Sequence, residues 1–161
     1  METFLGLTGF TWALFGAGVA AVLGGIGSAI GISLAAGTAA GVLSEDEAKF
    51  GQVLPLCAMP GTQGIYGFIA AVLVAVFFDI LGGNTATPPV LGFAAFLACQ
   101  PVAWLCLFTA IYQGHAAQGA ISVVASEKKV PSLVFPALVE TYAILALIIT
   151  ILMLLGIQAA L

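Results

Sequence analysis

Three short polar breaks divide an otherwise apolar chain, and this pattern restricts the fold more than any other feature. The breaks are 44–49, 82–89 and 126–131. The apolar stretches they separate are about 10–43, 50–81, 90–125 and 132–157. Each is longer than the roughly 20 residues that a bilayer crossing needs. Strands of a membrane barrel would alternate polar and apolar residues, which these stretches do not do. The pattern therefore predicts an all-α membrane protein with four transmembrane helices, because a helix satisfies its own backbone groups in lipid.

The composition supports a lipid environment. Hydrophobic residues make up 62% of the 161 residues and charged residues only 6%, whereas a soluble domain carries about 25% charged residues. Three basic and seven acidic residues give a net charge of -4. The chain lacks the basic face of a nucleic-acid binder, so we expect lipid and other proteins as its partners and no nucleic acid.

The lysines predict an orientation. Lys49 lies in the first break, Lys128 and Lys129 lie in the third, and the second break has none. The positive-inside rule then places loops 44–49 and 126–131 in the cytoplasm and both termini outside the cell membrane. The acidic residues of these two loops offer docking surfaces for a partner.

The two halves of the chain resemble each other. Ser44-Glu45 recurs as Ser126-Glu127 at an offset of 82, and Leu54, Ala58 and Thr62 recur as Leu133, Ala137 and Thr141 at an offset of 79. This duplication predicts one helical hairpin over 1–83 and a second over 84–161. Glu140 falls opposite Gly61, so the second copy alone has a carboxylate there.

Glu140 is the acidic residue that falls in the interior of a span, whereas Asp79 lies at the outer end of the second. Glu140 lies about nine residues, or ~13 Å, into the fourth apolar stretch and therefore near mid-membrane. A carboxylate there costs at least ~2.5–3.5 kcal/mol to insert. It has to be protonated, paired or bound to a cation, and no Lys or Arg lies at a comparable depth. A protonated Glu that merely joins two helices by a hydrogen bond is the alternative to a functional role.

Other polar residues accompany this carboxylate. Thr62, Gln63 and Tyr66 can share one face of the second helix, Pro60 loosens that helix, and Gln113 lies in the third span. One carboxylate with neutral hydroxyl, amide and carbonyl oxygens suits a hard monovalent cation. Hydrogen bonding between helices is the alternative for Thr62 and Gln63. No set of residues typical of a catalytic site occurs.

The first span is rich in glycine. Gly24-Gly25-Ile26-Gly27 is followed by Gly31, Gly37 and Gly41. Small residues let helix backbones approach closely in a membrane. We therefore expect this span to form the tightly curved inner layer of an oligomer.

Three segments together resemble a known family. They are 60–67, 113–114 and 139–145, and they are similar to the proteolipid (K, or c-type) subunit of bacterial V-type rotary ATPases, in particular to the sodium-translocating branch. The resemblance implies a Na⁺ site formed by the main-chain carbonyl of Met59, the side chains of Thr62, Gln63 and Gln113, and the carboxylate of Glu140. It also implies that Tyr66 hydrogen-bonds this carboxylate and holds the site closed. The family has Leu at the position of Met59, which does not alter a carbonyl ligand.

The same resemblance implies a non-catalytic subunit of a homo-oligomeric, two-layered ring. The first and third helices would form the inner layer, and the second and fourth the outer layer. Glu140 would meet a stator membrane subunit of the a/I type, and the cytoplasmic loops would meet a central-stalk subunit. ATP would be hydrolysed on soluble partner subunits.

Three alternatives remain open at this point. A ring that carries H⁺ would need Glu140 alone, and in that case the polar residues around it would have no role as ligands. A four-helix membrane scaffold would leave both Glu140 and its polar neighbours unexplained. A small ion-coupled transporter would need a substrate cavity with more polar lining.

Overall fold

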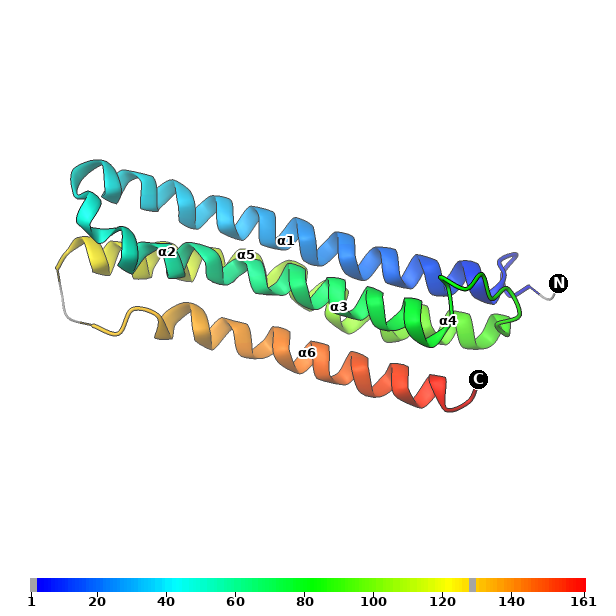
Figure 1. The fold of residues 1–161 in the computed structure, drawn as a ribbon. Coiled ribbons are helices and arrows are strands. Elements are labelled where there is room, and N and C mark those ends of the chain that lie inside the picture. Colours follow the sequence, from blue (N-terminus) through cyan, green and yellow to red (C-terminus); the bar gives the residue numbers. More distant parts are fainter. Residues whose placement is uncertain (1–2, 128–129) are drawn as a thin grey trace.

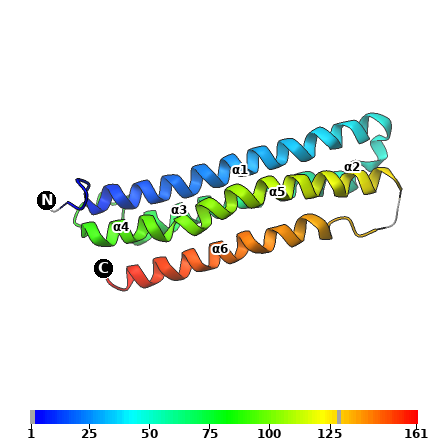
Figure 2. The same ribbon diagram turned by 180° about the vertical axis from the view of Figure 1, so that it is seen from behind.

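The computed structural model describes residues 3–127 and 130–161 as a bundle of long helices (Figures 1 and 2). In chain order the elements are α1 (Gly9–Glu45), η1 (Glu47–Lys49), α2 (Phe50–Ala58), η2 (Met59–Gly61), α3 (Thr62–Phe77), α4 (Pro89–Ala98), α5 (Gln100–Ala125) and α6 (Val134–Gln158). The elements η1 and η2 are short 3₁₀ turns.

These elements form four spans that are long and apolar enough to cross a membrane. They are Gly9–Glu45, Glu47–Phe77, Pro89–Ala125 and Val134–Gln158. The predicted all-α membrane fold with four spans is thus confirmed. The division into hairpins at residue 83 stays a prediction, and Lys128 and Lys129 of the third break lie outside the described residues.

The second helix ends at Phe77, earlier than the predicted boundary near residue 81. Asp79 and Gly83 adopt left-handed backbone conformations, with φ of 48° and 76°. The N–H of Ile80 donates to the carbonyl of Ala75, which closes a turn at the helix end. Asp tolerates the left-handed region better than most residues, so the chain turns there although the flanking side chains are still apolar.

The third span contains a break that the apolar pattern did not predict. Cys99 separates α4 from α5, and Pro101 follows within the first turn of α5. Proline has no N–H to donate back along the helix, which weakens the ladder at this point. The side-chain amide of Gln100 donates to the carbonyl of Phe96 at 2.9 Å and so satisfies one acceptor near the break.

The helices run side by side along one axis. In both views α1 and α6 lie on opposite sides of the pair formed by α3 and α5 (Figures 1 and 2). The chain ends lie at one end of the bundle, together with the connection between α3 and α4. The turn between α1 and α2 and the connection between α5 and α6 lie at the other end. This arrangement places α3, α5 and α6 around one shared interior.

Glycines let α1 pack at backbone contact. A Cβ added at Gly27 would lie 2.7 Å from the carbonyl oxygen of Leu107, and one at Gly31 would collide with the carbonyl of Ala110. Other glycines of the same helix, such as Gly25 and Gly37, meet nothing within 4 Å. Close contact thus uses one face of α1, and the small residues on its other side leave room for a further helix.

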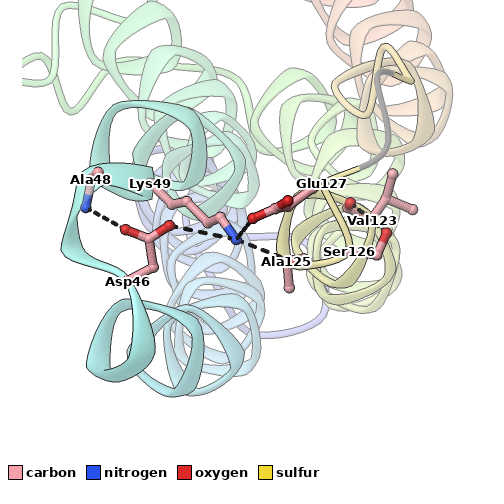
Figure 3. A network of polar contacts seen from close by, with 7 residues as sticks. All are labelled: Asp46, Ala48, Lys49, Val123, Ala125, Ser126 and Glu127. Atoms are coloured by element: carbon pink, nitrogen blue, oxygen red, sulfur yellow. Dashed lines mark hydrogen bonds and ion pairs between the residues drawn. The ribbon is translucent and has the colours of Figure 1, made fainter.

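Lys49 joins the two connections at the end opposite the termini (Figure 3). Its Nζ donates to the carbonyl of Ala125 at 3.2 Å, and it lies 3.6 Å from Asp46 and 3.8 Å from Glu127. The Ala125 carbonyl belongs to the last turn of α5, where a positive charge is favourable. Lys49 therefore connects the end of the first hairpin's turn to the C-terminal end of α5.

Candidate ion-binding site

The site begins where Pro60 interrupts the second span. Residues Met59–Gly61 form the 3₁₀ turn η2 between α2 and α3. The carbonyl of Met59 accepts two hydrogen bonds from Thr62, one from its backbone N–H and one from its hydroxyl at 2.9 Å. The turn places a backbone carbonyl and a side-chain hydroxyl next to each other at the start of α3.

Two glutamine side chains extend this group into the bundle. The Thr62 hydroxyl lies 3.2 Å from Oε1 of Gln63. The amide of Gln63 donates to Oε1 of Gln113 at 2.6 Å, which links α3 to α5. Both glutamine side chains are 0% exposed. An unpaired amide at such a position would cost about 1–3 kcal/mol, so the pair stabilises each member.

Glu140 completes the group from α6. The hydroxyl of Tyr66 donates to its Oε1 at 2.8 Å. The amide of Gln113 donates to Oε2 at 3.4 Å, and at 2.9 Å to the main-chain carbonyl of Pro136. Hydrogen bonds to a carboxylate are about twice as strong as neutral ones, so the short bond from Tyr66 fixes the position of this side chain.

The charge of Glu140 has no basic neighbour in the described part of the chain. Lys49 is the one lysine among residues 3–127 and 130–161, and it is bound at the end of the bundle (Figure 3). Glu140 is partly buried and lies on α6, at the edge of the bundle. A carboxylate placed in this way can be neutralised by a proton, by a small cation or by a group on another molecule.

All six residues that the sequence analysis singled out lie in one connected group. Hydrogen bonds link Met59, Thr62, Gln63, Gln113, Glu140 and Tyr66 across η2, α3, α5 and α6. The group contains one carboxylate, two hydroxyls, two amide oxygens and a backbone carbonyl, which are the kinds of oxygen that hard cations prefer. Their role as ligands stays a prediction.

The carbonyl of Pro136 is the member that sequence reasoning missed. It lies one helical turn before Glu140 and accepts a hydrogen bond from Gln113. The sequence carries no signal for it, because every residue of a helix has a backbone carbonyl.

One known protein family matches both halves of the chain. The family of ATP synthase C subunits matches residues 15–74 and 93–153, one segment in each half of the chain. These two segments cover more than half of the sequence. The chain belongs to the ATP synthase C-subunit family.

Two individual relatives share much of the sequence. The chain is 38% identical to a V-type sodium ATPase subunit K of Enterococcus hirae over 150 residues, which is 92% of this chain and 93% of that protein. It is 40% identical to an A-type ATP synthase subunit K of Methanocaldococcus jannaschii over 144 residues, which is 88% of this chain and 61% of the archaeal protein. The likeness to the first relative therefore spans nearly the full length of both chains.

Membership of the C-subunit family shows what kind of assembly the bundle belongs to. Members of the family are non-catalytic, ion-translocating subunits of rotary ATPases, and they assemble into homo-oligomeric rings. The expectation of a non-catalytic subunit in the membrane is thereby confirmed. A ring also accounts for the small residues that α1 leaves open, because a neighbouring copy can pack against them.

Proposed function

We propose that the chain is the Na⁺-carrying rotor-ring subunit of a V/A-type rotary ATPase. Each protomer would bind one Na⁺ at Glu140, Thr62, Gln63, Gln113 and the carbonyl of Met59, with Tyr66 holding the carboxylate. The observation that carries this proposal is the continuous hydrogen-bonded group around Glu140. It gathers neutral oxygens from the second and third spans beside the carboxylate of Glu140 in the fourth.

The neutral oxygens favour Na⁺ over H⁺ as the ion. A proton on Glu140 needs one acceptor, whereas Na⁺ needs several oxygens to replace its hydration shell. The buried pair of Gln63 and Gln113 supplies two such oxygens. The relative from Enterococcus hirae is named as a sodium ATPase subunit, which supports the same choice. A ring that carries H⁺ at Glu140 remains the second candidate.

Neutralisation of Glu140 is the physical requirement for rotation. A bare carboxylate would oppose movement of the ring through lipid, and a bound Na⁺ removes that penalty. A stator membrane subunit of the a/I type would exchange the ion when Glu140 passes it. One Na⁺ crossing a potential of 100 mV involves about 2.3 kcal/mol, a quantity that ATP hydrolysis on partner subunits can supply.

The partners at the two ends follow from the proposed orientation. Loops 44–49 and 126–131 would face the cytoplasm and dock the central stalk, with both termini outside. Lys49 supports this docking, because it holds the end of α5 and the turn after α1 together as one surface. The exposed carboxylates of Asp46 and Glu127 would be available to a partner there.

Carbodiimide labelling of Glu140 in assembled rings tests the choice of ion. The reagent attacks the protonated carboxyl group, so a bound Na⁺ should protect Glu140 from labelling. Protection should weaken as the pH falls, because protons compete with Na⁺ for the same carboxylate. Labelling that is indifferent to Na⁺ would reject the sodium ring and leave the proton ring. Failure of Glu140 to react at all would argue against both.

A further inference from the structure

The hydroxyl of Ser28 on α1 accepts a hydrogen bond from the backbone N–H of Gly64 on α3 at 2.7 Å. Ser28 is 6% exposed and lies in the glycine-rich part of α1. Gly64 directly follows Thr62 and Gln63. The bond therefore joins α1, which supplies none of the proposed ligands, to the backbone that carries two of them.

The start of α3 explains why this N–H needs a partner. The first N–H groups of a helix have no acceptor within the helix, and a side chain at the N-cap usually satisfies the second or third of them. The N-cap of α3 is Gly61, which has no side chain to serve this purpose. Gly64 is the third residue of α3, and its N–H lies within a span where water is absent. Ser28 thus provides from another helix the oxygen that an N-cap residue would normally provide.

Gly24 fixes the other side of the same peptide unit. A Cβ at Gly24 would lie 2.9 Å from the carbonyl oxygen of Gln63, so that oxygen rests directly against α1. The Gln63 carbonyl and the Gly64 N–H belong to one peptide group. Gly24 and Ser28, one helical turn apart, therefore hold this group at both of its polar ends. Gly64 itself has little room, because a Cβ there would lie 3.0 Å from Ser28 Oγ.

We propose that Ser28 is a positioning residue for the ion site, which it serves by capping α3 and fixing the backbone of Thr62 and Gln63. This inference rests on the proposed function, because it concerns the affinity of the same site for Na⁺. Ser28 does not touch the ligand oxygens. It acts through the Gly64 N–H, and the affinity of the site depends on how well the two side chains are held.

The test measures the Na⁺ concentration that half-protects Glu140 from carbodiimide in assembled rings. Ser28→Ala should raise this concentration about tenfold, as expected when a supporting hydrogen bond is lost. The labelling rate without Na⁺ should stay the same, since the carboxyl group itself is untouched. Ser28→Thr keeps the hydroxyl and should restore protection. Ser33→Ala is the matched control, because Ser33 is exposed on the same helix.

The outcomes separate this inference from the proposed function. If wild-type rings show no protection by Na⁺, the proposed function fails and the inference fails with it. If wild-type rings are protected and Ser28→Ala rings have the same half-protecting concentration, the inference alone is wrong. Should Ser28→Ala rings fail to assemble, Gly64→Ala decides, because its Cβ would press on the same hydroxyl. Wild-type affinity in assembled Gly64→Ala rings would overturn the inference.

Discussion

At the scale of single residues, the two oxygens of Glu140 have unequal partners. Tyr66 donates to Oε1 at 2.8 Å, and Gln113 donates to Oε2 at 3.4 Å. The first bond is short and charge-assisted, whereas the second is near the limit of a hydrogen bond. Oε2 is thus the oxygen more easily released to a cation, and Tyr66 is the group that keeps the carboxylate in place.

Tyr66→Phe tests this assignment. The variant removes one hydroxyl that donates to a carboxylate, an interaction worth about 1.5–3 kcal/mol. We expect the Na⁺ concentration that half-protects Glu140 to rise at least about tenfold, with ring assembly unchanged. Tyr142→Phe is the control, because Tyr142 lies two residues from Glu140 and is 62% exposed. Equal effects of the two substitutions would contradict a specific role for Tyr66.

Much of this site could be predicted from residue types alone. Glu140 was identified because a charge in the interior of a span is rare and costly. Thr62 and Gln63 were identified because polar side chains within a span are also costly and therefore indicate a function. Gln113 was identified in the same way as a polar group of the third span, and Met59 entered as a ligand only through the resemblance to a family. The Pro136 carbonyl and the Ser28 hydroxyl were missed, because a backbone group has no signature in a sequence and a serine can satisfy itself within its own helix.

At the scale of elements, the 3₁₀ turn η2 is the feature that exposes the Met59 carbonyl. Pro60→Ala restores an N–H and lets α2 and α3 join as one regular helix. Rotation of the following residues would move Thr62 and Gln63, so we expect weaker Na⁺ protection of Glu140, by roughly tenfold. Pro89→Ala is the control, because Pro89 begins α4 at the end of the bundle that holds the chain termini. Unchanged protection in Pro60→Ala rings would show that the turn is dispensable.

The connection made by Lys49 calls for a different measurement. Lys49→Met keeps most of the side chain and removes the charge from the contacts with Ala125, Asp46 and Glu127 (Figure 3). Ion pairs at a surface contribute little, so the loss of stability should be at most about 1 kcal/mol. Thermal unfolding of solubilised rings, with choline chloride setting the ionic strength, should show the difference shrinking at high salt. An accompanying change in Na⁺ protection of Glu140 would contradict a role confined to this end.

Element boundaries were harder to predict than the elements themselves. Hydropathy placed the end of the second helix near residue 81, yet Asp79 turns the chain soon after Phe77. It also gave no sign of the break at Cys99, because apolar residues lie on both sides of Gln100 and Pro101. Hydropathy reports where lipid can surround a helix, whereas backbone geometry decides where the helix ends.

At the scale of the whole molecule, the bundle exposes large apolar side chains along its length. Ile65, Phe68 and Leu145 are each more than half exposed. Lipid or neighbouring copies must cover these side chains, which agrees with the ring that membership of the C-subunit family implies. The composition made this outcome predictable. The number of copies in the ring depends on the angle between neighbouring copies. That angle is set by the whole interface between two copies and by no single residue.

The capacity of the ring for Na⁺ provides the last prediction. Each chain has one carboxylate within the polar group, so a loaded ring should hold one Na⁺ per protomer. Glu140→Gln keeps an oxygen that can accept from Tyr66 and removes the charge, so rings should assemble and retain no Na⁺ in a binding assay with ²²Na⁺. Asp79→Asn is the matched control. Its carboxylate lies beyond the end of α3, and Asn tolerates the left-handed conformation of that residue equally well. Glu140→Gln rings that bind Na⁺ as the wild type does would place the ion elsewhere, whereas loss of Na⁺ in Asp79→Asn alone would move the site to the end of the bundle.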